Sequence, residues 1–523
     1  LATSSTLASR AMGILVSSSS RATAASLARV MGVSSSPGAT ALTLMPCGAS
    51  LAIQLARHGA LPLDVTVIEP RADVGRGLAY STDDPDHRLN GTAGTHLVDP
   101  DDPGELTRWC AAQGIALDDA DAVAPGGALF VRRRDFGRFL ADAFAREARR
   151  GGRVRLRHLR DEAITVTHTQ QRITVTTRGH ASLPSDLLVI ATGNVPTRFP
   201  ARVAADVDGH PGVIADPWNL PQLRAIDKDA RVLVLGTGLT ALDVVTTLLR
   251  AGHRGSITPV SSRALRPRAH RPAFDVPPAL PGAEMLHRID ARLPEFLRVL
   301  PRPLTARVLV RALRYRIAQA RKHGLSWYAP FDELRDPLWQ LWSALEIDEK
   351  RRLLRHVRRW YDVHRFRAPP QNEAIVREAE RQGQVVFRAA KVGSIAGGDR
   401  GALAVEWRKG ATGAVHTETF DAVINCAGLD SGAGAMRNPI LASSMRQGWL
   451  VPDATGVGFA VDAKCRPLDA SGVPSDRVRV IGPPTAGAFG DPLGAMFIAA
   501  QVRRMLPGVF ASLARRRRNA ATG

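Results

Sequence analysis

Cysteine is scarce in this chain, and its spacing rules out several chemistries. The four cysteines among the 523 residues, Cys47, Cys110, Cys426 and Cys465, stand far apart and form no C-x-x-C motif. No group of histidine and cysteine has the spacing of a zinc site. The sequence therefore disfavours a flavin reductase that works through a dithiol, and it predicts no metal site. Scattered thiols of this kind are typical of the reducing cytoplasm, where we expect this protein.

Long apolar runs are also missing, and lysine is rare. No apolar run is long enough to span a bilayer, so we expect no membrane partner. The net charge is +21, but it comes almost entirely from arginine, which is spread through the chain. A composition rich in Ala and Arg and poor in Lys indicates a GC-rich, bacterial genome, and we expect no nucleic-acid partner. The arginine run at 515–518 is interpreted as part of a solvated basic tail over residues 509–523.

Acidic residues are absent from the start of the chain, and the first one is Asp64. Residues 1–38 are rich in Ser, Ala and Arg, a composition that buries little surface and predicts a disordered segment unlike the rest of the chain. One interpretation of this segment is a transit peptide. The other is a mis-set start or a shifted reading frame, because the chain begins with Leu1.

The clearest motif that is present is an apolar strand at 232–235 followed by Gly236-Thr237-Gly238-Leu239-Thr240-Ala241. This is the G-x-G-x-x-A turn that opens a dinucleotide-binding βαβ unit. Gly236 permits the tight turn, Gly238 lets a pyrophosphate approach the backbone, and Ala241 lets the helix pack closely on the strand. The helix N-terminus then offers N–H groups to the phosphates. An ordinary strand-to-helix turn is the alternative interpretation.

The end of the next strand indicates which dinucleotide binds there. This strand is expected near 256–260, at a sheet edge because of Pro259, and Ser261, Ser262 and Arg263 follow it. No acid is present to hold a ribose 2′-hydroxyl. Arginine and serine would receive a 2′-phosphate, so the pattern favours NADP(H) over NAD(H).

A second βαβ unit is predicted earlier in the chain. A strand at 39–44, a helix at 50–58 and a strand at 64–68 lead to Glu69, placed to hold the ribose hydroxyls of a dinucleotide. The turn of this unit keeps only its last glycine, Gly48. Met45 stands where the pyrophosphate should lie, and Pro46 lacks an N–H. A reading-frame error near codon 47 and a real loss of FAD binding both explain the altered turn.

The two units begin two copies of one plan. In each copy, a helix, a strand and antiparallel strands lead to a last apolar strand, which ends in Ala191-Thr192-Gly193 in one copy and in Cys426-Ala427-Gly428 in the other. This order predicts an α/β protein with two dinucleotide-binding, Rossmann-like domains, each with an antiparallel β-meander, plus a helical insertion. We expect an FAD-binding domain at 39–200 and 421–508, an NAD(P)H-binding domain at 214–275 and 371–420, and the insertion at 276–370.

The insertion is predicted from its apolar periodicity, and its tryptophans are interpreted as core rather than as a substrate site. It ends in a run rich in His and Arg, residues 364–367, that either faces a site or lies at a solvated edge. No nucleophile or acid–base triad is found anywhere in the chain.

The motif set resembles the FAD/NAD(P)-binding flavoprotein family that includes HpyO-type urate hydroxylases and CreE-type aspartate N-monooxygenases, and more distantly the ornithine and lysine N-hydroxylases. The resemblance covers about residues 45 to 508. The segments that carry it are Val67-Ile68-Glu69-Pro70, Gly75-Arg76-Gly77-Leu78-Ala79-Tyr80, His87-Arg88-Leu89-Asn90, Arg134-Asp135-Phe136-Gly137, Ala191-Thr192-Gly193, Gly236 to Ala241, His364-Arg365-Phe366-Arg367 and the stretch from Gly482 to Gly494.

This resemblance implies an FAD-dependent, NADPH-using monooxygenase that forms a flavin C4a-(hydro)peroxide and hydroxylates a small polar substrate at a nitrogen or a ring. Its partners are a small-molecule substrate and O2; the sequence does not indicate an oligomeric state. An NADPH-flavin reductase or oxidase without oxygen insertion, and a non-catalytic dinucleotide-binding protein, are the alternatives. Asn90 is a candidate for a position near the flavin ring, and Arg367 for contact with an anionic substrate.

The predicted cofactor residues follow from these motifs. For NADPH they are Gly236, Gly238, Ala241, Ser262 and Arg263. For FAD they are Gly48, Glu69, Arg71, Gly75, Asn90, Ala191, Thr192, Gly193, Gly482, Asp491 and Gly494.

Overall fold

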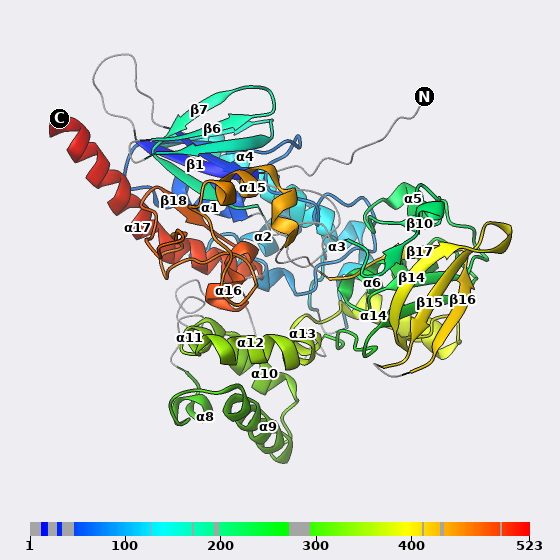
Figure 1. Cartoon of the computed structure of the whole chain (residues 1–523). Helices are drawn as coiled ribbons and strands as arrows, with labels where there is room; N and C mark the ends of the chain where they lie inside the picture. The colour runs from blue at the N-terminus through cyan, green and yellow to red at the C-terminus, as the bar shows by residue number, and fades with distance from the viewer. Residues whose placement is uncertain are drawn as a thin grey trace.

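Two α/β domains and a group of helices make up the chain (Figure 1). The computed structural model describes residues 12–18, 29–33, 47–125, 127–169, 172–192, 198–270, 293–410, 413–428, 433–491 and 494–522. The predicted fold class is confirmed, since each domain carries a largely parallel sheet and an antiparallel meander, and the helices form an insertion.

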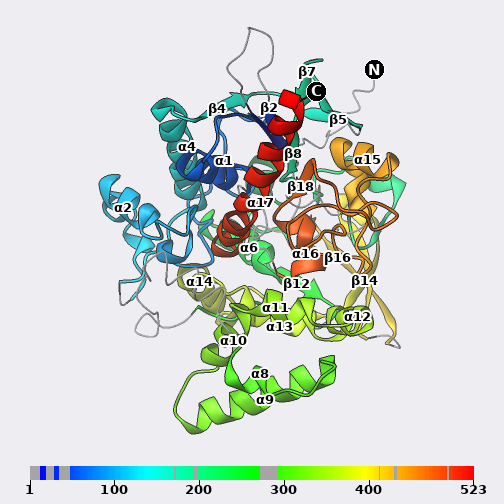
Figure 2. The same ribbon diagram turned by 90° about the vertical axis from the view of Figure 1, so that its left-hand side faces the viewer.

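The first domain is built on a six-stranded sheet. Its strand order is β18 (Val478–Val480), β8 (Leu187–Ile190), β1 (Met12–Ser18), β2 (Arg29–Val33), β3 (Leu63–Ile68) and β4 (Val154–Leu159). All neighbouring pairs except those of β1 are parallel. Helix α1 (Cys47–His58) packs between α4 (Arg133–Arg150) and α17 (Ala495–Thr522) on one face of this sheet (Figure 2). The meander consists of β5 (Ala163–His168), β6 (Ile173–Thr177) and β7 (Ser182–Ser185), and α15 (Pro439–Arg446) packs on it.

The N-terminal segment differs from the prediction. Residues 12–18 and 29–33, expected to be disordered, form β1 and β2 at the centre of the first sheet. The physical reason is that β8 and β3 each leave a row of backbone N–H and C=O groups that needs a neighbouring strand. The predicted strand at 39–44 and the altered turn from Thr43 to Pro46 lie outside the described residues.

The second domain has a parallel five-stranded sheet. Its order is β10 (Val213–Ile214), β17 (Ala422–Asn425), β11 (Val232–Leu235), β12 (Ile257–Ser261) and β13 (Arg388–Ala389). Helices α6 (Leu239–Arg250) and α14 (Pro370–Arg381) pack together on it, and α5 (Leu220–Arg224) lies beside α6. The meander is β14 (Lys391–Gly397), β15 (Leu403–Arg408) and β16 (Val415–Phe420), extended by β9 (Arg202–Val203).

The predicted domain boundary at residue 421 is therefore wrong. Strand β17 pairs with β10 and β11 of the second sheet, so residues 422–425 complete the second domain. The two domains repeat one plan. Strand β17 follows the second meander and joins the second sheet, just as β8 follows the first meander and joins the first sheet. Strand β18 is the element that comes back to the first domain, beside β8.

Pro259 does not mark a sheet edge, contrary to expectation. Strand β12 lies between β11 and β13. Pro259 lacks an N–H, and the missing donor falls in a gap of the pairing, between the bridge of Ile257 to Val385 and the ladder of Val260 and Ser261 with β13. The strand can therefore lie inside the sheet, because no carbonyl of the neighbouring strand needs a hydrogen bond from residue 259.

The helical insertion comprises α8 (Glu295–Arg298), α9 (Ala306–Lys322), α10 (Tyr328–Arg335), α11 (Leu338–Ser343), α12 (Ile347–His356) and α13 (Arg358–Arg365). Trp342 is buried in its core, as predicted, whereas Trp360 is 45% exposed. The insertion contacts the first domain through the Trp342 indole, which donates to the Gly487 carbonyl at 2.7 Å, and through Arg351, which donates to the Ala454 carbonyl at 2.8 Å.

The remaining helices are short, except at the C-terminus. They are α2 (Glu105–Ala112), α3 (Ile115–Asp118), α16 (Ala486–Phe489) and the 3-10 turns η1 (Ala93–Thr95), η2 (Ala120–Ala122), η3 (Ala205–Val207), η5 (Asp399–Gly401), η6 (Ala433–Arg437) and η7 (Pro483–Thr485). The expected basic tail from residue 509 is instead the second half of α17, because Val509 and Leu513 continue its apolar face and are buried. No helix among the described residues is long and apolar enough to cross a membrane.

A buried polar network joins the two domains. The Arg133 guanidinium of α4 donates to the Asp243 carboxylate of α6 at 2.7 Å, and both side chains are almost inaccessible. His87 lies beside this pair, between the hydroxyls of Thr82 at 2.8 Å and Thr247 of α6 at 3.1 Å. Removing one partner of a buried ion pair costs about 3–5 kcal/mol, so the network fixes how the domains face each other.

The buried imidazole of His87 predicts a pH-dependent stability. Burial and the nearby Arg133 charge lower the pKa of His87 to about 3, from 6.5. Between these values the unfolded chain binds a proton that the folded chain refuses, so folding stability falls as pH falls below 6.5. His87→Gln removes this proton. The free energy of unfolding of wild type minus that of the variant, measured by urea denaturation, should fall by about 2 kcal/mol between pH 7 and pH 5. Two parallel stability curves over that range would contradict this.

Candidate functional site

The glycine turn of the second domain has the geometry of a phosphate cradle. Gly236 adopts a positive φ of 123°, and a Cβ there would lie 2.3 Å from the Cys426 carbonyl oxygen. Gly238 precedes α6, and a Cβ there would meet only open space. Thr237 holds the turn in place, because its hydroxyl donates to the Leu265 carbonyl at 2.5 Å and lies 2.9 Å from the Ser261 hydroxyl. Ala241 is fully buried where α6 packs on the sheet.

Two arginines flank the end of β12. Ser262 and Arg263 are exposed there, next to the glycine turn. Arg359 of α13 donates to the Ser262 hydroxyl at 2.9 Å, so a second guanidinium reaches the same place from the insertion. Arg263 forms no ion pair within the described part of the chain. This set of one hydroxyl and two guanidinium groups fits a phosphate monoester.

Glu69, at the end of β3, is the clearest polar group of the first domain. Its side chain is fully buried, and one carboxylate oxygen accepts from the Arg71 backbone N–H at 3.0 Å and from the Arg71 guanidinium at 3.2 Å. The other oxygen is buried without a hydrogen-bond partner among the described residues. Leaving a buried acceptor unpaired costs about 1–3 kcal/mol. The two hydroxyls of an adenosine ribose would supply the missing donors, so this residue fits FAD.

Close backbone approaches surround the start of α1. Gly48 lies in its buried first turn. Gly75 has a φ of 100°, and a Cβ there would lie 3.0 Å from Leu140 and 3.1 Å from Ala49. At Gly482, with a φ of 74°, a Cβ would lie 2.4 Å from the Cys47 sulfur. Side chains at these positions would separate α1 from the strand ends that it packs against.

Two predicted FAD residues follow β8, and a third stands in the loop after residue 89. Ala191 and Thr192 follow β8 and are buried; Gly193 lies outside the described residues. Asn90 is partly buried, and its side chain makes no hydrogen bond to any residue that the structure covers. Such an amide can bind a cofactor or substrate, and the position of Asn90 near the flavin ring stays a prediction.

His96 of the same loop was not found from the sequence, because no motif contains it. Its Nδ1 lies 3.1 Å from the Thr92 carbonyl, and its ring contacts Phe136 edge to face. Burial, together with the charges of Arg133 and Arg365, lowers the pKa of His96 to about 4. The imidazole is therefore neutral near pH 7 and, with Nδ1 protonated, its Nε2 can accept a hydrogen bond.

Asp491 and Gly494 lie where the first domain meets the insertion. One Asp491 carboxylate oxygen accepts from the Arg365 guanidinium of α13 at 2.8 Å and lies 3.5 Å from the Tyr361 hydroxyl. At Gly494 a Cβ would lie 3.2 Å from the same guanidinium. The Asp491 carboxylate is thus turned toward the insertion. Within the run at 364–367, which the sequence left open between a site and an edge, Arg365 is the residue that reaches this junction.

Arg367 does not offer a charge to an anionic substrate, contrary to its predicted role. Its guanidinium donates to the Asp332 carboxylate at 2.8 Å and to the His364 carbonyl at 3.0 Å, and it stacks over the Tyr328 ring. Its side chain is 7% exposed. The charge is therefore neutralised inside the insertion, a partnership across 35 residues that no local pattern could reveal.

Comparison with known proteins agrees with this geometry. Residues 46–195 match the FAD-NAD(P)-binding family. No curated protein matches the sequence. Among solved structures, the chain is similar to an ornithine N-hydroxylase of Kutzneria sp. 744 in a complex of reduced FAD, NADP+ and L-ornithine. Identity is 16%, the TM-score is 0.58, and the match covers 90% of this chain and 97% of that one.

Two further structures are similar over comparable lengths. The ornithine hydroxylase of Pseudomonas aeruginosa matches with 11% identity and a TM-score of 0.56, over 90% of this chain and 98% of that one. The FAD-bound cadaverine monooxygenase of Erwinia amylovora matches with 12% identity and a TM-score of 0.56, over 89% of this chain and 92% of that one. Residues 46–195 therefore resemble an FAD-NAD(P)-binding family, and the chain shares the α/β fold of the ornithine N-hydroxylase structure.

Proposed function

We propose that this chain is an FAD-dependent, NADPH-using monooxygenase that hydroxylates a nitrogen of a small molecule. The observation that carries the proposal is the contrast between its two dinucleotide sites. One ends in the buried Glu69 with an unpartnered oxygen, and the other ends in Ser262 with the exposed Arg263. A carboxylate suits ribose hydroxyls and a guanidinium suits a 2′-phosphate, so the two sites take different dinucleotides.

The residues that would hold FAD belong to the first domain. Glu69 would bind the adenosine ribose and Arg71 would orient Glu69, while Gly48, Gly75 and Gly482 keep the backbone close around the start of α1. Ala191, Thr192, Asp491 and Gly494 would border the same site, Gly193 is proposed with them although it lies outside the described residues, and Asn90 would reach the flavin end. Bound FAD supplies the transfer of electrons from NADPH to O2, which no side chain can perform.

The residues that would hold NADPH belong to the second domain. The N–H groups of the turn from Gly236 to Ala241 would bind the pyrophosphate, and Ser262, Arg263 and Arg359 would bind the 2′-phosphate. The buried Arg133–Asp243 pair holds this domain against the first one, so that the two sites stay opposed. We infer a cytoplasmic location, because all four cysteines are free thiols.

The overall reaction balances with one atom of O2 in the hydroxylamine and the other in water. An amine, O2, NADPH and a proton give a hydroxylamine, NADP+ and water. The N–H becomes N–OH, NADPH is oxidised by two electrons, and O2 supplies both oxygens. The chain contributes binding, orientation and exclusion of water, which agrees with the absence of a nucleophilic triad in its sequence. The fold shared with ornithine N-hydroxylases over 90% of the chain supports this reaction class.

The unpartnered oxygen of Glu69 predicts a loss of FAD affinity on substitution. Glu69→Gln removes the charge and turns half of the acceptor pair into a donor. We expect the dissociation constant for FAD to rise roughly 10- to 100-fold, because a hydrogen bond to a charged group contributes about 1.5–3 kcal/mol. Titration of the apoprotein with FAD, followed by flavin fluorescence, measures it. Asp64→Asn, at the other end of β3, is the control and should bind FAD like wild type. Equal affinity of both variants would refute the role of Glu69.

The basic end of β12 predicts the cofactor preference. Arg263→Ala should raise the KM for NADPH roughly tenfold, about 1.4 kcal/mol, and leave the KM for NADH unchanged, because only NADPH carries the 2′-phosphate. Steady-state oxidation of both nucleotides by the FAD-loaded protein measures the ratio. Arg377→Ala, an exposed arginine of α14, controls for general loss of positive charge. An equal effect on both nucleotides would place the 2′-phosphate elsewhere.

Oxygen insertion is the decisive test of the proposed reaction. The FAD-loaded protein is supplied with NADPH, 18O2 and a panel of amines, and products are analysed by mass spectrometry. We expect an amine product that carries one labelled oxygen, formed in proportion to the NADPH oxidised. Hydrogen peroxide alone, with every amine, would show a reductase or oxidase instead.

A further inference from the structure

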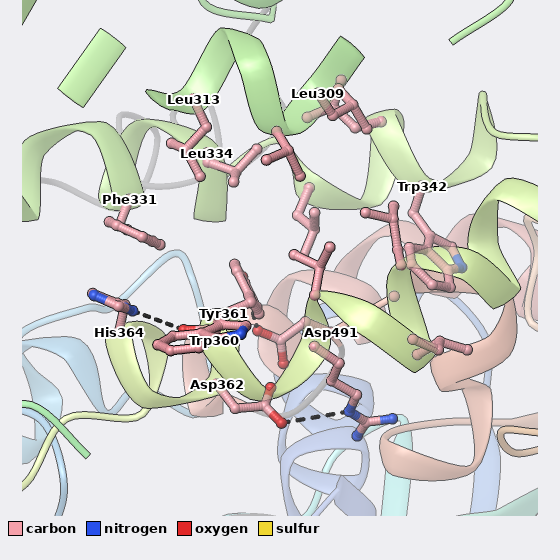
Figure 3. A pocket seen from close by; sticks show the side chains of 18 of the residues that line it. Leu309, Leu313, Phe331, Leu334, Trp342, Trp360, Tyr361, Asp362, His364 and Asp491 are labelled. Atoms are coloured by element: carbon pink, nitrogen blue, oxygen red, sulfur yellow. Dashed lines mark hydrogen bonds and ion pairs between the residues drawn. The ribbon is translucent and has the colours of Figure 1, made fainter. Parts of the chain in front are cut away.

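A cavity of about 680 Å³ opens in the helical insertion, against the first domain. Its walls are mostly aliphatic and aromatic, with Leu309 and Leu313 from α9, Phe331 and Leu334 from α10, and Trp342 from α11 (Figure 3). Trp360 and Tyr361 of α13 form its base on the side of the first domain. A volume of this size takes a small organic ligand, and walls of this kind favour an apolar one.

Two carboxylates lie at one end of the cavity, and Arg314, His356, Arg358 and His364 also belong to its lining. Asp491, of the first domain, and Asp362 of α13 lie there close to Tyr361 (Figure 3). Arg358 pairs with Asp362, with the nitrogen and oxygen 3.5 Å apart. Asp491 is only 8% exposed, and Arg365 takes one of its oxygens. Its other oxygen is buried and has no hydrogen-bond partner in the part of the chain that the structure describes.

An unpaired, buried carboxylate oxygen specifies the chemistry of a ligand. It can only accept hydrogen bonds, so the ligand must present a donor. Arg358 and Arg365 balance the charges of the two carboxylates, so the unpaired Asp491 oxygen is the feature that favours a ligand with an N–H donor over an anionic one. A free amino acid would also place its own carboxylate in the cavity, where the walls offer mainly carbon. Burying such a charge without a partner is strongly unfavourable.

We propose that the cavity is the substrate site and that it takes an amine with an apolar body, such as an aryl-alkyl or alkyl amine, whose N–H donates to Asp491. The apolar body lies against Leu309, Leu313 and Trp342. Asp491, which belongs to the first domain and faces the insertion, is thereby a substrate-binding residue. The inference rests on the proposed function for the fate of the amine, but the binding itself does not depend on it.

The position of Asp491 also orients the ligand. Asp491 stands three residues before Gly494, at whose end of α17 the FAD site is proposed, and Arg365 contacts both places. An amine held by Asp491 therefore has its nitrogen at the first-domain end of the cavity, and its apolar body points away from the cofactor side. This substrate class differs from the small polar substrate expected from the sequence.

A matched set of ligands separates the body from the head group. The FAD-loaded protein, without NADPH, is titrated by calorimetry with 4-phenylbutylamine, 4-phenylbutanol, 4-phenylbutyrate and ornithine. We expect the amine to bind at least tenfold more tightly than the alcohol or the carboxylate, and ornithine to give no saturable heat. Binding of the alcohol as tight as that of the amine, or preference for ornithine, overturns the proposal.

Variants locate the site. Leu313→Trp fills the cavity and should weaken 4-phenylbutylamine at least tenfold, whereas Leu325→Trp, an exposed position after α9 outside the cavity, should bind it within twofold of wild type. Leu309→Phe is a second, milder filling variant if the first does not fold. Asp491→Asn, compared at full FAD occupancy, should weaken the amine at least tenfold and leave the alcohol unchanged. Unaltered amine affinity in the filling variants refutes the site.

Flavin reduction in the same variants tests the proposed reaction separately from ligand binding in the cavity. Anaerobic reduction of the bound flavin by NADPH is followed at 450 nm in wild type and in Leu313→Trp, and we expect equal rates because Leu313 belongs to neither proposed dinucleotide site. If NADPH does not reduce the flavin in either protein, the proposed function fails while the calorimetric series still decides the ligand class. If reduction is normal but the amine does not bind, the cavity proposal alone fails.

Discussion

The ion pair between Arg133 and Asp243 is the constraint on which the arrangement of the whole chain depends. Each proposed dinucleotide site takes its glycine turn from its own domain, so neither turn dictates how the two domains face each other. The pair, with His87 beside it, is buried exactly where α4 of one domain meets α6 of the other. Because sliding the domains would expose two unpaired charges to an apolar contact, the relative position of the sites is held by a large electrostatic cost.

Local patterns predicted the elements that position the cofactor sites. A run of apolar residues ending in glycine, as at Val232–Leu235, forms a buried parallel strand with little ambiguity. The order of elements then predicted two sheets and two meanders, because strands of one repeat pair with each other. The glycine turn at Gly236 could also be read, since only glycine fits a positive φ with a carbonyl 2.3 Å from its would-be Cβ.

Long-range partnerships were beyond the reach of these patterns. The boundary near residue 421 was misplaced because the sheet that a returning strand joins is decided by pairing and not by its sequence. Arg367 was predicted to contact an anionic substrate, although it pairs with Asp332 of another helix. His96 carries no motif at all, and its neutral state comes from burial and from arginines on distant elements.

The insertion changes how the C-terminal glycine-rich stretch is understood. As a linear motif, the stretch from Gly482 to Gly494 predicts FAD binding along its whole length. In space, its two ends serve different surfaces. Gly482 is pressed against the start of α1, whereas the Asp491 carboxylate turns to α13 and the cavity above it. The Asp491 carboxylate shares one oxygen with Arg365 and leaves the other unpaired, so it stands between the first domain and the cavity in which we propose that the amine binds. One short segment therefore borders both proposed sites, which a linear reading of its glycines does not reveal.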